Sequence, residues 1–346
     1  MPVPGQPLRK LGFLTIGRFD EADPGPGHEE TLATIERAEV LGFDTVWVRQ
    51  RHLQPGISSP VAMLAAATQR TSRIELGTAV IPLGLENPLR LAEDLATVDI
   101  LSGGRLNPGV SVGVPMHYDN YKAALYPDTH DVEDFSKKRA ERLLAYLRGE
   151  PVSDFEGTIG IEQFHRRVQP HSPGLAGRVW YGGGLYSAIW AAGQRLNYLT
   201  SNVVSTEHIG EAAGPADFAT IQAEQIDAFR AHHPDPATAR VSQGLVVIPT
   251  DSATAEQIDR YRRYAEARLP RTSQTHGPRG MMFAPDLVGT SDELAEALYA
   301  HPGFQRVDEV AFALPFTFGP DDYVQIVTDL AEKLGPKLGW TPAGTR

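Results

Sequence analysis

The feature that most constrains this chain is a regular alternation of short apolar runs with amphipathic helical patterns. Eight runs rich in β-branched and aromatic residues are expected to be strands. They lie at residues 11–17, 44–48, 74–83, 108–112, 178–181, 198–201, 241–249 and 307–314. Because each strand should be followed by a helix, we expect the strands to lie parallel in one sheet. Eight such units predict a closed (β/α)8 TIM barrel, which is an α/β fold.

The helical patterns carry residues that start and stop helices. Pro88 stands near the first turn of one pattern, and Gly42 is a natural residue to end another. The expected helices cover residues 29–41, 61–70, 88–104, 187–194, 216–232, 254–269, 292–300 and 321–334. We interpret residues 1–346 as a single barrel domain.

Two long segments interrupt the alternation. Residues 115–135 follow the fourth expected strand, and residues 270–290 lie between the seventh and the eighth. In a TIM barrel the loops at the carboxyl ends of the strands build the active site, so long insertions there are candidate lids. Met116, His117 and Tyr118 are therefore candidates for contact with a substrate. Surface packing of the same loop is the alternative.

Composition excludes several classes of function. The 32 basic and 43 acidic residues give a net charge of −11, and no run of Lys and Arg offsets it, so nucleic acid is not an expected partner. The chain has no cysteine, which excludes disulfides and thiolate chemistry, and we expect no metal site. No apolar run reaches the roughly 18 residues of a membrane span, and the first residues lack a signal-peptide pattern. A soluble, cytoplasmic protein is expected.

The stretch VWYGGGLYSAIWAA at residues 179–192 places three glycines between an expected strand and an expected helix. The first N–H groups of a helix are unsatisfied and carry a partial positive charge, which suits an anion such as phosphate. Gly182, Gly183 and Gly184 would let the anion approach the backbone, and the hydroxyl of Ser187 would add a donor. A tight turn without a ligand is the structural alternative.

Longer segments resemble the bacterial luciferase-like flavin-dependent monooxygenases. The resemblance rests on ERAEVLGFDTVWV (36–48), SRIELGTAVIPL (72–83), NPLRLAEDLATVDILSGGRL (87–106), YGGGLYSAIWAAGQRLNYLTSN (181–202) and EVAFALPFTFGPDDYVQIVTDLAEKLGPKLGW (309–340). It implies a TIM-type barrel, usually dimeric, that binds reduced flavin mononucleotide (FMN) or, in some branches, the deazaflavin F420. It also implies that Gly183, Gly184 and Ser187 contact the flavin phosphate. The substrate is not implied.

Two further cofactor positions follow from the resemblance. The family often has a non-proline cis peptide bond beside the flavin ring, and alignment puts it at Ala79–Val80. The family's phosphate-binding arginine at the end of the fourth strand is replaced by Val112. Losing such a charge-assisted contact costs about 1.5–3 kcal/mol. Either a nearby basic residue compensates or the flavin is held more weakly.

The segment after the second strand holds the candidate catalytic residues. Where the family reads E-H-H, this chain has Gln50, Arg51 and His52, so Arg51 takes the place of the family's catalytic histidine. An arginine stays protonated and is not a general base at neutral pH, but it binds anions and stabilises developing negative charge. His52 is the candidate for proton transfer. A structural role for His52 is the alternative.

Three functions remain open at this stage. The first is a monooxygenase that takes reduced FMN from a separate reductase, since no nicotinamide-binding G-x-G-x-x-G follows a strand, and uses O2 on a small organic substrate. The second is F420-dependent hydride transfer, and the third is a flavin-binding protein without catalysis. A homodimer is expected from the resemblance alone.

Overall fold

The computed structural model describes residues 7–206, 217–277 and 280–344, so Ala216 of one expected helix and residues 278–279 of the second insertion lie outside the described part. Its centre is a ten-stranded sheet in which every pair of neighbours is parallel. The strands are β1 (Lys10–Thr15), β2 (Thr45–Val48), β3 (Glu75–Thr78), β4 (Ile81–Pro82), β5 (Leu106–Asn107), β6 (Gly109–Ser111), β9 (Trp180–Gly182), β10 (Asn197–Leu199), β12 (Val241–Gln243) and β16 (Glu309–Ala313).

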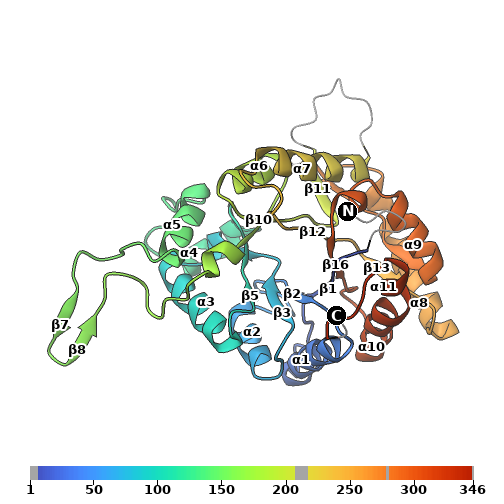
Figure 1. The fold of residues 1–346 in the computed structure, drawn as a ribbon, viewed down its shortest axis with the longest axis horizontal. Helices are drawn as coiled ribbons and strands as arrows, with labels where there is room; N and C mark the ends of the chain where they lie inside the picture. The colour runs from blue at the N-terminus through green and yellow to red at the C-terminus, as the bar shows by residue number, and fades with distance from the viewer. Residues whose placement is uncertain (1–6, 207–216, 278–279, 345–346) are drawn as a thin grey trace.

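The sheet closes on itself as the barrel prediction requires. Its order is β4-β6-β9-β10-β12-β16-β1-β2-β3-β5. The strands β3 and β4 are consecutive parts of the third expected strand, β6 lies within the fourth, and β5 directly precedes β6 in the chain. Because β3 pairs with β5 and β4 with β6, the two ends of the order meet, and Figure 1 shows the resulting ring of strands. The TIM-barrel fold is confirmed.

Helices surround the ring of strands (Figure 1). They are α1 (Pro24–Val40), α2 (Pro60–Thr68), α3 (Pro88–Ser102), α4 (Lys122–Leu125), α5 (Lys137–Leu147), α6 (Leu185–Gly193), α7 (Phe218–His232), α8 (Ala255–Arg268), α9 (Ser291–Ala300), α10 (Pro320–Asp329) and α11 (Gly335–Lys337). Local sequence explains their ends. The side chain of Asn87 accepts from the first N–H groups of α3, and Gly103 ends that helix in a left-handed conformation with φ of 69°.

The structure corrects several expected boundaries. The run 241–249 is not one strand, because β12 ends at Gln243 and β13 (Val247–Pro249) pairs instead with β15 (Leu287–Gly289). The helix α5, which follows the fourth strand, was not predicted, and neither was the hairpin of β7 (Gly157–Ile159) and β8 (Glu162–Phe164). Figure 1 shows this hairpin projecting away from the barrel.

The second insertion covers one side of the rim at which the strands end. Within residues 270–290, β14 (Met281–Phe283) pairs antiparallel with β11 (Val203–Ser205), which lies just beyond β10. The pairing places part of the insertion beside the carboxyl ends of the barrel strands. Its action as a lid stays a prediction.

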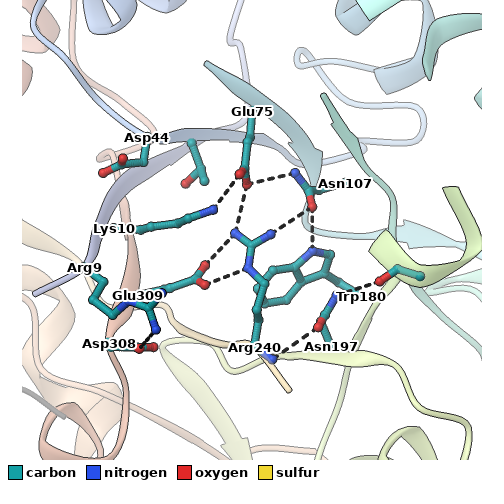
Figure 2. A network of polar contacts seen from close by, with 12 residues as sticks. Arg9, Lys10, Asp44, Glu75, Asn107, Trp180, Asn197, Arg240, Asp308 and Glu309 are labelled. Atoms are coloured by element: carbon teal, nitrogen blue, oxygen red, sulfur yellow. Dashed lines mark hydrogen bonds and ion pairs between the residues drawn. The ribbon is translucent and has the colours of Figure 1, made fainter. Parts of the chain in front are cut away.

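Charged side chains close the amino-terminal end of the barrel (Figure 2). The guanidinium of Arg240 donates to Glu309 at 2.7 and 2.8 Å and to Glu75 at 2.9 Å, and it lies 4.8 Å from the ring centroid of Trp180. The ammonium of Lys10 bonds Glu75 at 2.5 Å. Two cations and two carboxylates therefore neutralise one another at this end, which leaves the opposite rim for chemistry.

The middle of the barrel is packed with apolar side chains. Trp47, Trp180, Leu199 and Ala311 come from four different strands and form one buried cluster, against which Ala79 and Val80 pack. The rings of Trp47 and Trp180 meet edge to face with centroids 5.2 Å apart. The barrel is thus a filled core, and its reactive surface lies at the carboxyl rim.

Candidate functional site

A glycine-lined opening lies where β9 meets α6. Gly183 has φ of +155°, and a Cβ added to it would lie 2.6 Å from the Cβ of Ser187, so only glycine fits there. Gly184 is the N-cap residue of α6, and the first turn of that helix carries no acidic residue. The structure therefore brings Gly183, Gly184 and Ser187 together at an open helix N-terminus. That they bind phosphate stays a prediction.

Two polar side chains that the sequence analysis missed lie at the same opening. Among the residues that the structure describes, the buried amide Nε2 of Gln225 has no hydrogen-bond partner, and it lies 3.8 Å from the position of a Cβ added to Gly184. The Cβ of Ser205 lies 3.4 Å from that position. A buried donor without a partner is costly, so its presence beside a helix N-terminus suits an acceptor that binds there. The signal in the sequence that could have indicated Gln225 was a polar glutamine on the largely apolar, buried face of α7.

Val112 supplies no cation from the fourth strand, whereas α5 places one beside α6. Val112 is partly buried and packs against the main hydrophobic core. The Nζ of Lys137 donates to the carbonyl oxygen of Tyr186, in the first turn of α6, at 3.2 Å and lies 5.2 Å from the ring centroid of Trp190. Burial lowers the pKa of Lys137 below its ordinary value. A positive charge thus stands beside the first turn of α6.

The peptide bond between Ala79 and Val80 is cis, as predicted. A Cβ added to Gly182 would lie 3.0 Å from Cγ1 of Val80, so Val80 faces the glycine-lined opening. Both residues also pack on the cluster around Trp47. The side chains of Ala79 and Val80 therefore form an apolar surface between the glycines and the centre of the barrel. Its contact with a flavin ring stays a prediction.

The two candidate catalytic residues lie at the rim near β2. The guanidinium carbon of Arg51 lies 5.1 Å from the ring centroid of Phe316, and burial lowers the pKa of Arg51. The ring of His52 lies 4.6 Å from that of Tyr121, which belongs to the first insertion. Arg51 thus contacts the loop after β16, whereas His52 contacts the insertion. Their catalytic roles stay predictions.

Hydrogen bonds join the first insertion to the rim and hold it together internally. The hydroxyl of Tyr126 donates to the carbonyl oxygen of Gly84 at 3.0 Å, and that of Tyr118 donates to the carbonyl oxygen of His130 at 3.0 Å. Tyr118 is buried inside the insertion itself, whereas Met116 is 76% exposed. His117 has a positive φ of 56°. Substrate contact by Met116, His117 and Tyr118 stays a prediction.

The described residues contain neither a candidate metal centre nor a candidate membrane span. Among residues 7–206, 217–277 and 280–344, no group of three or more His, Cys, Asp and Glu side chains is placed to hold a metal ion. None of the helices in that part of the chain combines the length and the apolar character needed to cross a membrane.

Comparison with known proteins agrees with this fold. Residues 10–322 match the luciferase-like monooxygenase family. The chain is 29% identical to limonene 1,2-monooxygenase of Rhodococcus erythropolis over 192 residues, which are 51% of this chain and 48% of that enzyme. It is 32% identical to an F420-dependent glucose-6-phosphate dehydrogenase of Kineococcus radiotolerans over 160 residues, 44% of each chain. The curated relatives are thus matched over about half of their length or less.

A solved structure supports the fold over the whole chain. The oxygenating constituent of 3,6-diketocamphane monooxygenase from Pseudomonas putida, in complex with FMN, superposes with a TM-score of 0.65. The match covers 96% of this chain and all of that one at 12% identity, which supports the fold alone. Because the family match extends over most of the chain, the protein belongs to the luciferase-like monooxygenase family of oxidoreductases.

Proposed function

We propose that this chain is a flavin-dependent monooxygenase that binds reduced FMN with its phosphate at the N-terminus of α6. The unpartnered amide of Gln225 is the observation that carries the proposal, since a phosphate oxygen would satisfy it. Gly183 and Gly184 present no side chain to the anion, and the Ser187 hydroxyl would add a donor. Lys137 is the basic residue that would compensate for Val112.

The remaining groups at the rim fit the other end of such a cofactor. When bound, reduced FMN supplies the electrons with which monooxygenases activate O2. The apolar surface at Ala79 and Val80 would support the ring and exclude water. His52 would carry a proton at its imidazole nitrogens, and Arg51 would hold negative charge, because its guanidinium stays protonated.

F420-dependent hydride transfer is the second candidate. It is favoured by the likeness to F420-dependent glucose-6-phosphate dehydrogenases, three of which match this chain at 32–39% identity. FMN and F420 share a tricyclic ring on a phosphorylated ribityl chain, so the opening at α6 fits both. The proposal for FMN, by contrast, includes a separate flavin reductase as partner. It also includes a small-molecule substrate and a homodimer.

Titration with the two cofactors separates these functions. We expect reduced FMN to bind more tightly than F420, and O2 uptake to depend on an added FMN reductase and a substrate. Preferential binding of F420 would replace the first candidate by the second. The third outcome is that FMN binds but no substrate raises O2 uptake above the uncoupled background. If a panel of terpenes, ketones and aromatic acids gave this result, the protein would be one that only binds flavin.

A further inference from the structure

Arg49 lies on the inward face of the barrel. Side chains alternate along β2, so Trp47, which faces the interior cluster, shares its side of the strand with Arg49. The ladder continues to this residue, because the N–H of Arg49 donates to the carbonyl oxygen of Thr15 at 3.0 Å. Arg49 therefore stands above the packed centre of the barrel, at the mouth of its carboxyl rim.

Neither Arg49 nor Arg51 has a counter-ion among the described residues. No carboxylate there forms an ion pair or hydrogen bond with either guanidinium, and Nε of Arg51 is buried without a hydrogen-bond partner. By contrast, Arg240 at the other end of the barrel bonds two carboxylates.

The two cations also act on each other. Burial and then the like charge of Arg51 lower the pKa of Arg49 to about 10. Two partly desolvated guanidinium groups in proximity oppose folding unless an anion joins them. The arginine fork matches the geometry of a carboxylate or a phosphate, and the ring of Phe316 beside Arg51 adds an apolar surface. The site therefore suits an oxyanion attached to an apolar body.

We propose that Arg49 and Arg51 form an oxyanion subsite that takes the carboxylate of an organic substrate, apart from the opening at α6 that takes the phosphate of the cofactor. This inference rests on the proposed function in one respect, which is that the anion bound by the two arginines belongs to the substrate of the monooxygenase. It makes an organic acid with an apolar body the preferred substrate class over a neutral hydrocarbon. The loop after β16 would contact the apolar part of that molecule through Phe316.

Isothermal titration with benzoate and its neutral analogue benzamide tests the subsite in the full chain without flavin. We expect benzoate to bind at least about tenfold more tightly than benzamide, and Arg49→Met and Arg51→Met each to remove that preference. The matched control is Arg90→Met, an exposed arginine paired with Glu93, which should retain it. Melting of the ligand-free variants checks folding. Because each substitution removes an unpaired cation, both should melt no lower than the wild-type protein.

A second titration separates the subsite from the cofactor site. Benzoate should bind with unchanged affinity to protein saturated with FMN, because the two sites do not overlap. Displacement of benzoate by FMN would overturn the proposal by assigning the arginines to the flavin itself. Equal binding of benzoate and benzamide, or unchanged preference in both variants, would also overturn it. Failure of FMN to bind while benzoate binds would leave the subsite standing and remove the proposed function.

Discussion

At the scale of single residues, the site is marked by polar groups that the fold leaves without partners. Gln225 is 2% exposed, and neither its Nε2 nor the buried Nε of Arg51 has an acceptor within the described part of the chain. Such groups cost stability in the absence of a ligand, and functional sites are where a fold carries such costs. Stability and ligand affinity should therefore change in opposite directions when these residues are replaced.

The Gln225→Met variant tests this trade-off. Removing a buried unpaired amide should leave the melting temperature of the ligand-free protein unchanged or raise it, because only a long 3.4 Å contact with Tyr198 is lost. Affinity for FMN should fall by about tenfold, equivalent to roughly 1.4 kcal/mol. Calorimetric melting and FMN titration measure the two effects. A large fall in melting temperature with unchanged affinity would contradict the assignment.

Lys137 and its neighbour Lys138 offer a matched pair. Lys137 lies beside α6, whereas Lys138 is exposed on the outer side of α5. The Lys137→Met variant should weaken binding of FMN about tenfold but leave binding of riboflavin, which has no phosphate, unchanged. Lys138→Met should affect neither ligand. Equal effects of the two substitutions would show that Lys137 acts only through overall charge.

At the scale of elements, the sequence predicts the barrel well because its strands are apolar and parallel. All eight expected strands overlap a barrel strand, since runs such as β16 are buried on both faces. The third strand was expected to be continuous, but it is divided into β3 and β4 at the cis bond. The helix α5 was missed although Leu143, Leu144 and Leu147 form its buried face. The many charged residues of α5 make its apolar stripe short, so the apolar periodicity did not predict a helix there.

The hairpin of β7 and β8 escaped prediction for a different reason. Its apolar side chains do not face the core, since Ile159 is 61% exposed and Ile161 is 99% exposed. Alternation along a strand indicates structure only where one face is buried. The contacts that define this element, such as the Thr158–Gln163 hydrogen bond of 2.8 Å, lie within the hairpin itself.

Removal of the hairpin should leave the barrel intact. Replacing residues 155–164 by a short Gly/Ser linker should change the free energy of unfolding by less than about 1 kcal/mol, because the hairpin projects from the barrel (Figure 1). Urea denaturation of the two proteins measures the difference. A loss of several kcal/mol would mean that the hairpin is an integral part of the folded core.

At the scale of the whole molecule, the barrel has two differently charged ends. At the amino-terminal end, the carboxylates hold the pKa of Arg240 above its ordinary value despite burial. Burial raises the pKa of Glu309, whereas Arg240 and Lys10 overcome burial and lower the pKa of Glu75. At the carboxyl rim, Arg49 and Arg51 have no carboxylate partner in residues 7–206, 217–277 and 280–344. Sequence patterns could not predict this difference, because it depends on which distant side chains the closed sheet brings together.

Arg240→Met should strongly destabilise the protein. It leaves two carboxylates without their main counter-ion, and breaking such a buried ion pair costs about 3–5 kcal/mol. The loss should grow as the pH rises from about 4 to 7. Without Arg240, the pKa of Glu309 in the folded state rises further above its value in the unfolded state. The folded protein then favours the protonated carboxyl, so its free energy of unfolding decreases as the pH rises and this carboxyl has to ionise. Urea denaturation across this range measures the effect.

The exposed pair of Arg90 and Glu93 supplies the comparison. Arg90→Met should cost less than about 1 kcal/mol at every pH in that range, because the pair lies at the surface. A charge-balanced amino-terminal end would be contradicted if Arg240→Met reduced the free energy of unfolding by as little as Arg90→Met does. It would also be contradicted if the reduction became smaller as the pH rises.

The central claim is that the opening formed by Gly183, Gly184 and Ser187 binds the phosphate of a flavin. The most direct measurement is the affinity of the wild-type protein for FMN relative to riboflavin, which differs only in lacking that phosphate. Several charge-assisted bonds of roughly 1.5–3 kcal/mol each predict a preference for FMN of at least about 100-fold, reduced by Ser187→Ala. Equal affinity for FMN and riboflavin would contradict the account.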